Sequence, residues 1–188
     1  HGPSAHVILG LKERTFPEEE KGIIPPEVEK GLKFMSTFYY SDDKTTPLRG
    51  EDVSNAIREL LSVTRWGSLD YLIVDMPPGT GNETLDTIRL MPKSEFMVIT
   101  TPSKVALSTV RKLVSMLNEI KTPIAGIIEN MRTETSPSIE KEIGEMGAPY
   151  LGYIPYDKKI EKNIGNPEEL MKTSFAESLE KVLSESSL

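Results

Sequence analysis

The sequence predicts an α/β protein, in which a parallel sheet is flanked by helices. Short apolar runs rich in β-branched and aromatic residues, such as YLIV at 71–74 and FMVIT at 96–100, are typical of strands buried on both faces of a parallel sheet. Other segments carry apolar residues at helical spacing, most clearly residues 105–120. Because strands and helices alternate, we expect βαβ units with right-handed crossovers.

The N-terminal part of the chain carries weaker patterns. Residues 1–11 are typical of the tail of a strand–loop unit, because a short apolar run there ends at a glycine. Residues 15–29 are rich in Glu and Pro, and we expect a solvated surface excursion. Residues 32–40 are expected to form a strand that ends in aromatic residues. Residues 51–64 have acidic residues in their first turn and one apolar helical face, which predicts a helix.

The second half of the chain continues the alternation. We expect a helix at 82–91, ended by Pro92, and strands at 123–129 and 150–155. Residues 158–188 are expected to form a terminal helix that packs on the sheet. A dinucleotide-binding fold would share this order of elements, but the sequence has no GxGxxG motif after a strand.

Length and composition limit the function. A chain of 188 residues fits one domain, so we expect residues 1–188 to form a single domain. The net charge of −7 argues against a nucleic-acid or anionic-membrane partner, because those partners need clustered Lys and Arg. There is no cysteine, which excludes disulfides and any thiolate-bound metal or cluster built from this chain alone. No signal peptide or membrane-spanning stretch is present, so the expected location is the cytoplasm.

The predicted strand at 71–74 is followed by the most informative motif. Asp75 ends the strand, and ligands of open α/β sheets sit beyond the carboxyl ends of the strands. The next residues are two prolines, which stiffen the chain, and then Gly79 and Gly81, whose N–H groups can approach an anion. A turn capped by Asp75 is the alternative, but the whole string DMPPGTG favours a phosphate and metal site.

Asn130 follows the predicted strand at 123–129. A side-chain amide both donates and accepts hydrogen bonds, so it can match the edge of a purine. An Asx turn that closes the strand is an equally good interpretation.

The chain resembles the Mrp-type ATPases, the iron-sulfur cluster carriers among the MinD/ParA-like P-loop proteins. The segments that carry the resemblance follow one another in the family's order: HGPS at 1–4, LRG at 48–50, WGSLDYLIVDMPPGTG at 66–81, TTPSKVAL at 100–107, PIAGIIENM at 123–131 and YLGYIP at 150–155. The resemblance implies a protein that binds ATP and Mg²⁺, hydrolyses ATP slowly, forms a homodimer and serves iron-sulfur client proteins.

The resemblance also implies roles for single residues. Asp75 would close the Walker B strand and hold Mg²⁺, directly or through water. Pro78, Gly79 and Thr80 would belong to the switch that senses the γ-phosphate. Asn130 would read the adenine, and the loop that begins at Pro155 and Tyr156 would lie against the base. For Arg49, a dimer or phosphate contact and an ordinary surface position remain equally open.

The chain departs from the family pattern at two places. No GxxxxGK[ST] phosphate loop is present, and in the family the HGPS segment comes after that loop, the first strand and the first helix. We therefore expect a nucleotide-binding domain that is incomplete at its N-terminus. Where the family has CPxC, this chain has Ser136-Pro137-Ser138-Ile139, which argues against an iron-sulfur cluster at that place.

Two further hypotheses remain beside a slow ATPase. One is a non-catalytic α/β protein-interaction module, which the missing phosphate loop and cysteines favour. The other is a MinD/ParA-like positioning ATPase without a cluster, which ranks last because the C-terminal residues 184–188 are not basic. The residues that precede His1 decide between them: a phosphate loop there makes the protein an ATP hydrolase, whereas a natural start near His1 favours the interaction module.

Overall fold

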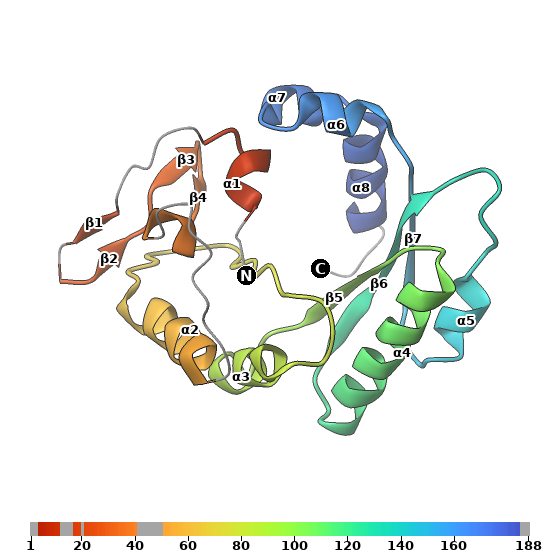
Figure 1. The fold of residues 1–188 in the computed structure, drawn as a ribbon, viewed down its shortest axis with the longest axis horizontal. Coiled ribbons are helices and arrows are strands. Elements are labelled where there is room, and N and C mark those ends of the chain that lie inside the picture. Colours follow the sequence, from red (N-terminus) through yellow and green to blue (C-terminus); the bar gives the residue numbers. More distant parts are fainter. Residues whose placement is uncertain (1–3, 12–16, 20, 41–50, 185–188) are drawn as a thin grey trace. The chain divides into compact units, whose positions relative to one another are not determined.

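The computed structural model describes residues 4–11, 17–19, 21–40 and 51–184 (Figure 1). The chain divides into two compact units. The first unit comprises His1–Met76 and Ile164–Pro167, and the second comprises Pro77–Asn163 and Glu168–Leu188.

The second unit is built on a parallel three-stranded sheet in the order β5-β6-β7. The strands are β5 (Phe96–Thr100), β6 (Ile124–Arg132) and β7 (Tyr150–Pro155). Helix α4 (Lys104–Glu119) joins β5 to β6, and the short helix α5 (Glu140–Gly144) lies between β6 and β7 in the chain. Helix α3 (Asn82–Leu90) precedes the sheet, and α6 (Lys159–Asn163), α7 (Pro167–Leu170) and α8 (Ser174–Ser184) follow it.

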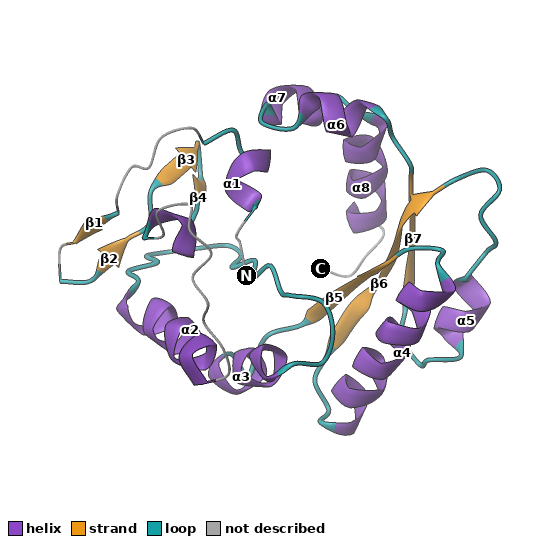
Figure 2. Cartoon of the chain, in the orientation of Figure 1, coloured by secondary structure: helices purple, strands orange, loops and turns teal. Residues whose placement is uncertain are grey.

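Both faces of this sheet are covered by helices, as the ribbon in Figure 2 shows. On one face, Ile127 packs in a buried cluster with residues of α4 and α5, among them Leu117 and Ile143. On the other face, the neighbouring Ile128 packs with Val182 of α8. Successive strand residues point to opposite faces, so burial on both faces requires a continuous apolar run in the sequence. The predicted α/β class, a parallel sheet flanked by helices, is confirmed.

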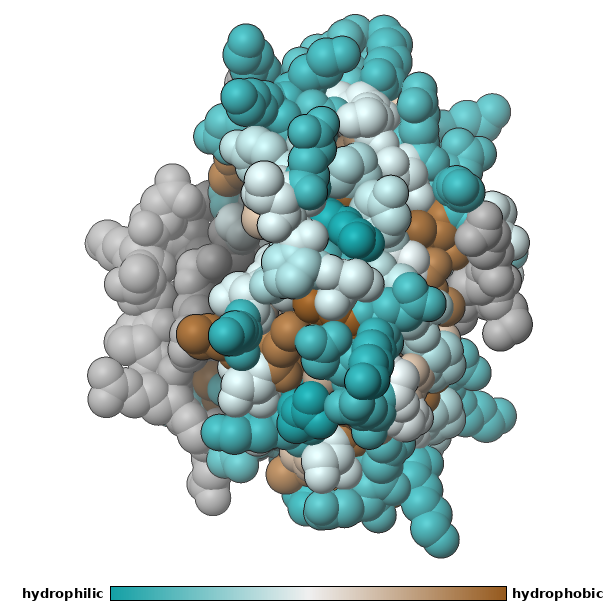
Figure 3. Space-filling view, turned by 90° about the vertical axis from the view of Figure 1, so that its right-hand side faces the viewer, coloured by the Kyte–Doolittle hydropathy of each residue, from teal (hydrophilic) through white to brown (hydrophobic). Residues whose placement is uncertain are grey.

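The outer surfaces of these helices are polar. Figure 3 shows the side of the molecule that carries α4 and α5 as mainly hydrophilic, with apolar side chains in small patches. Among the described residues, no helix is both long enough and apolar enough to cross a bilayer.

The first unit consists of short elements. They are α1 (Ala5–Ile8), the antiparallel pair β1 (Glu18–Glu19) and β2 (Ile23–Ile24), the antiparallel pair β3 (Glu27–Glu29) and β4 (Leu32–Lys33), the 3-10 helix η1 (Thr37–Tyr39) and α2 (Glu51–Val63). Phe38 and Tyr39 are buried, and the His6 ring stacks on Phe38 with 3.9 Å between ring centroids.

Most elements predicted in the second half of the chain are present. The predicted helices at 82–91 and 105–120 are α3 and α4, and the predicted helix at 51–64 is α2. The predicted strands at 96–100, 123–129 and 150–155 are β5, β6 and β7.

The predicted strand at 71–74 is wrong. The described stretch from residue 65 to residue 77 contains no strand, and Tyr71 and Ile73 are 73% and 90% exposed. A strand forms only by pairing with a neighbour, and no described strand pairs with this run. The apolar residues at 71–74 predicted a buried strand, but they did not specify which strand would pair with it.

Four further predictions need correction. Residues 32–40 are not one strand, because Ser36 accepts a hydrogen bond from the Phe38 N–H (3.2 Å) and starts η1. Residues 5–8 form a helix and not the tail of a strand. The described part of 15–29, expected as a solvated loop, contains the pair β1 and β2 and the strand β3, which pairs with β4 further along the chain. Residues 158–184 form three helices and not one, and Gly165, with a φ of +85°, ends the first of them.

Candidate nucleotide-binding site

The carboxyl edge of the sheet brings three predicted residues together. Asn130 lies near the end of β6, Pro155 ends β7, and Tyr156 follows it. All three line one cavity of about 120 Å³, here called the β6–β7 cavity. Its wall is completed by Met131, Asp157, Lys158, Ile160 and Glu161. Parallel neighbouring strands end at the same edge of a sheet, so the two loops meet there.

The cavity is too small for a whole nucleotide. Pockets for drug-sized molecules measure roughly 300–1,000 Å³, and this cavity is smaller. Tyr156 is 55% exposed, so this wall of the cavity is open to solvent in part. The Asn130 Oδ1 accepts a hydrogen bond from the Met131 N–H (2.9 Å), which is the Asx interaction expected at a strand end. This bond uses one lone pair of Oδ1, and an amide side chain has further donor and acceptor capacity.

The residues predicted to bind phosphate and metal are divided between the two units. Asp75 belongs to the first unit and is exposed, so its carboxylate is not packed inside protein. Pro78 and Thr80 belong to the second unit and are also exposed. Gly79 has a φ of +101°, a conformation that residues with a Cβ rarely adopt. The glycine is therefore required by the backbone at this position.

The start of α3 holds the glycine segment in place. The Thr84 hydroxyl donates a hydrogen bond to the Gly79 carbonyl (3.4 Å), and the Thr84 N–H donates to the Gly81 carbonyl (3.1 Å). The segment thus leads directly into the helix N-terminus, as the sequence predicted. Arg49 lies outside the described residues.

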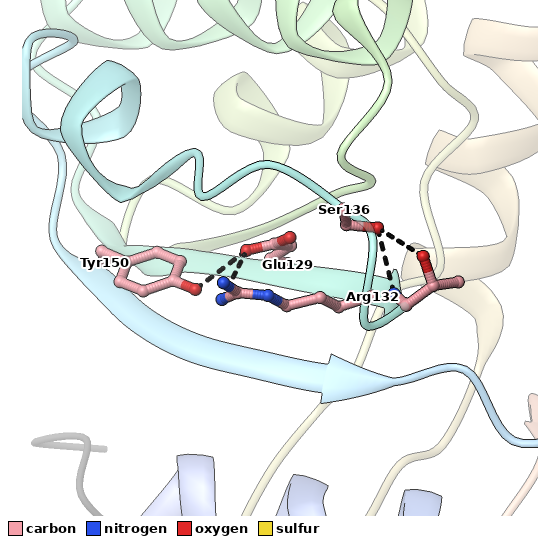
Figure 4. Close-up of polar contacts among 5 residues, drawn as sticks. Glu129, Arg132, Ser136 and Tyr150 are labelled. Atoms are coloured by element: carbon pink, nitrogen blue, oxygen red, sulfur yellow. Dashed lines mark hydrogen bonds and ion pairs between the residues drawn. The ribbon is translucent and has the colours of Figure 1, made fainter.

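A polar cluster around one buried carboxylate lies next to Asn130, and sequence reasoning missed it (Figure 4). Glu129 is completely buried, and its Oε2 accepts a hydrogen bond from the Tyr150 hydroxyl (3.0 Å). The Arg132 Nη1 lies 3.6 Å from the same oxygen, and the Arg132 guanidinium lies 4.4 Å from the centroid of the Tyr153 ring. We call these four residues the Glu129 cluster.

The electrostatics of this cluster follow from the burial of Glu129 and the partial burial of Tyr150. Burial raises the pKa of the Tyr150 phenol, and the hydrogen bond and charge of Glu129 raise the pKa further. The Glu129 Oε1 is buried and has no hydrogen-bond partner among the described residues. The signal in the sequence was a lone glutamate inside the apolar run IAGIIEN, which predicts a buried carboxylate that needs a partner.

The loop at 133–139 shows what replaces the expected cysteine motif. The Ser136 hydroxyl accepts from the Thr133 N–H (3.0 Å) and lies 2.9 Å from the Thr133 hydroxyl, so it closes a local turn. The 188 residues contain no cysteine, and no three His, Asp or Glu side chains in the described part of the chain are placed to hold a metal. The residues present therefore do not fit an iron-sulfur cluster. An open depression of about 770 Å³ beside α5 contains none of the predicted site residues.

The fold defines an α/β protein of the P-loop NTPase class. A nucleotide-binding protein from Archaeoglobus fulgidus, solved with ADP, matches with a TM-score of 0.72 at 26% identity, over 90% of this chain and 72% of its own. The cell division ATPase MinD of Pyrococcus furiosus shares the fold, with a TM-score of 0.54 at 21% identity over 71% of this chain and 56% of its own.

Within that class, the chain belongs to the ParA family of NUBPL iron-transfer P-loop NTPases, whose family model matches residues 1–186. It is 37% identical to the iron-sulfur cluster carrier protein of Methanococcus maripaludis, over 97% of this chain and 69% of that protein. It is 35% identical to the iron-sulfur cluster carrier protein of Aquifex aeolicus, over 98% of this chain and 57% of that protein. The resemblance inferred from the sequence motifs is confirmed, and the chain spans 57–69% of the length of these two relatives.

Proposed function

We propose that this chain is the nucleotide-binding part of an ATPase that binds Mg·ATP, hydrolyses it slowly and acts as a homodimer in iron-sulfur protein assembly. The observation that carries the proposal is the convergence of Asn130, Pro155 and Tyr156 on one cavity at the carboxyl edge of the sheet. The names of the relatives support it, since they are iron-sulfur cluster carriers, and a related structure was solved with ADP.

The β6–β7 cavity would hold the adenine. The Asn130 amide would donate to a ring nitrogen and accept from the exocyclic amine, a pairing that guanine cannot offer because it has a carbonyl there. The Tyr156 ring would cover one face of the base. The Tyr156 N–H donates a hydrogen bond to the Arg132 carbonyl (2.8 Å), and this link between the two loops supports a base pocket formed by both.

The segment at 75–81 would act on the phosphates. Asp75 offers exposed carboxylate oxygens, the ligand type that Mg²⁺ prefers, and Mg²⁺ would neutralise charge on the transferred phosphoryl group. The Gly79 N–H would bind the γ-phosphate, and hydrolysis would release residues 77–81 from that contact. The chain has no GxxxxGK[ST] motif, so we propose that the remaining phosphate donors come from residues that precede His1.

The role in iron-sulfur assembly would not use thiolates of this chain. Serine at 136 and 138 cannot replace cysteine as a ligand for iron in a cluster. We therefore propose that client proteins, and not these 188 residues, hold the cluster during assembly.

Calorimetry on the full protein tests the proposal. We expect Mg-dependent binding of ATP, and tighter binding of ATP than of GTP. Asp75→Asn should abolish ATP turnover and keep the wild-type circular dichroism spectrum, whereas Asp70→Asn, an exposed carboxylate five residues earlier, should keep turnover. Asn130→Ala should weaken ATP binding about two- to tenfold, the effect of one lost hydrogen bond.

One result would overturn this function. If the full protein binds no nucleotide with Mg²⁺ present, the ATPase proposal is wrong and the interaction module becomes the better hypothesis. If Asp75→Asn and Asp70→Asn lose turnover equally, Asp75 has no special role at the metal.

A further inference from the structure

We infer that Glu129 is a positioning residue for the nucleotide base: it acts through Arg132 to fix the end of β6 and, with it, the wall of the β6–β7 cavity. This inference rests on the proposed function, since the cavity is taken to hold the base. It adds a residue that does not line the cavity, because Glu129 is completely buried on the sheet.

A bulge at the end of β6 makes this coupling possible. Glu129 pairs with Tyr153, and Arg132 pairs with Pro155, so β6 advances three residues where β7 advances two. In a regular strand, residues three apart point to opposite faces. The extra residue of the bulge returns the Arg132 side chain to the face of Glu129, where the two form their ion pair at 3.6 Å.

One residue of the bulge has an unfavourable backbone conformation, which neighbouring contacts must stabilise. Met131 has a φ of +61°, which is uncommon for a residue that carries a Cβ. Such conformations persist only where neighbouring contacts determine them. The contacts here are the Asn130 Oδ1 on the Met131 N–H and the Arg132 side chain held between Glu129 and Tyr153.

Arg132 also reaches the cavity wall through its backbone. Its carbonyl accepts a hydrogen bond from the Tyr156 N–H (2.8 Å), and Tyr156 lines the cavity. The side chain of Arg132 is thus anchored at Glu129, and its main chain sets the position of Tyr156. Asn130 lies within the bulge, between Glu129 and Arg132 in the chain.

Stability alone does not account for a carboxylate at this position. Desolvation of a buried carboxylate can cost more than its ion pair returns, and here the Arg132 side chain is 25% exposed and one oxygen of Glu129 has no partner among the described residues. If the Glu129 carboxylate positions Arg132 and so the end of β6, its presence here is explained.

The test compares Glu129→Gln with Glu134→Gln, which removes an exposed carboxylate from the adjacent loop. Glutamine keeps an oxygen for the Tyr150 hydroxyl but removes the charge that holds Arg132. Without nucleotide, hydrogen exchange of the Tyr156 and Met131 amides should become about two- to tenfold faster in Glu129→Gln and stay unchanged in the control. If Glu129→Gln does not fold, Arg132→Gln replaces it, with the same expectation.

The second readout is the ratio of the Kd values for GTP and ATP. We expect the preference for ATP to fall about two- to tenfold in Glu129→Gln and not in Glu134→Gln. A purely structural role would weaken both nucleotides equally and leave the ratio unchanged. Unchanged amide exchange, or an unchanged ratio in a protein that binds ATP, overturns this inference alone, whereas a wild-type protein that binds no nucleotide overturns the proposed function and this inference together.

Discussion

Replacing Tyr150 by Phe tests whether the Glu129 cluster is held together by the hydrogen bond at its centre. Tyr150 is half-buried in β7, and its ring packs against the apolar cluster beneath α4 and α5. Phenylalanine keeps that ring and removes only the hydroxyl, which donates to the Glu129 Oε2 at 3.0 Å. Glu129 would keep only the ion pair with Arg132 at 3.6 Å.

The expected loss in the free energy of unfolding is about 2 kcal/mol. A hydrogen bond to a charged group contributes about 1.5–3 kcal/mol, and a buried carboxylate that loses its donor bears the cost of its own desolvation. For a protein of this size, about 2 kcal/mol corresponds to a fall in Tm of about 4–8 °C. Urea unfolding followed by circular dichroism measures the free energy, and a thermal scan measures the Tm.

The matched control is Tyr153→Phe. Tyr153 also belongs to the cluster, but it is exposed, and it contacts Arg132 through its ring face, which phenylalanine retains. We expect a change within about 0.5 kcal/mol, as at most exposed positions. If Tyr150→Phe costs no more than Tyr153→Phe, the Tyr150 hydrogen bond contributes nothing and the reasoning is refuted.

The same pair of variants predicts a pH dependence. The folded state raises the pKa of Tyr150 above the value of about 10 in an unfolded chain, mainly through burial and then through Glu129. The unfolded state therefore loses this proton first, so the stabilisation is complete below pH of about 10 and is lost as the pH rises above it. The stability difference between wild type and Tyr150→Phe should shrink between pH 9 and 11, as measured by urea unfolding at each pH, and a difference that grows would contradict the sign.

Two further predictions concern stability. Leu117→Ala removes a completely buried side chain of α4 and should lower the free energy of unfolding by about 3–5 kcal/mol in urea unfolding; a loss below about 1 kcal/mol would show that the site is not close-packed. Asp157 accepts hydrogen bonds from the Ser174 hydroxyl (2.7 Å) and the Lys159 N–H (2.8 Å), and these bonds lower the pKa of its carboxyl. Its stabilisation is present above the unfolded pKa and is lost as the pH falls through the folded pKa. Asp157→Asn should therefore make acid unfolding less steep between pH 5 and 2, and an unchanged acid transition would contradict this assignment.

The sequence predicted best those elements whose partners lie nearby in the chain. The runs that became β5, β6 and β7 pair with one another inside one unit, and the helix between β5 and β6 covers their common face. The run at 71–74 is also apolar, but no described strand lies beside it, and it is exposed. Apolar patterning therefore indicates that a segment seeks burial, but the pairing depends on a second segment that the pattern does not name.

The sequence also predicted that some of the candidate residues would lie near one another. Asn130, Pro155 and Tyr156 were expected at strand ends, and adjacent parallel strands bring such ends together whatever the details of register. The Glu129 cluster depends on register. Under strict alternation, Arg132 would lie on the face opposite Glu129, and only the bulge at Met131 places them together. No residue pattern in β6 predicts that bulge. A glycine would have indicated it, but Met131 occupies the left-handed conformation instead.

The two halves of the proposed site differ in how the fold fixes them. The base side is built from β6 and β7 within one unit, where a bulge, an ion pair and a backbone hydrogen bond set each residue. On the phosphate side, Asp75 belongs to one unit and Gly79 to the other, with Pro77 and Pro78 between them. A segment that must change its contacts when a phosphate leaves can have few internal contacts, whereas a pocket that selects a base needs many. For the proposed ATPase we therefore expect the base side, which the bulge and the ion pair of β6 hold, to stay fixed when a phosphate leaves.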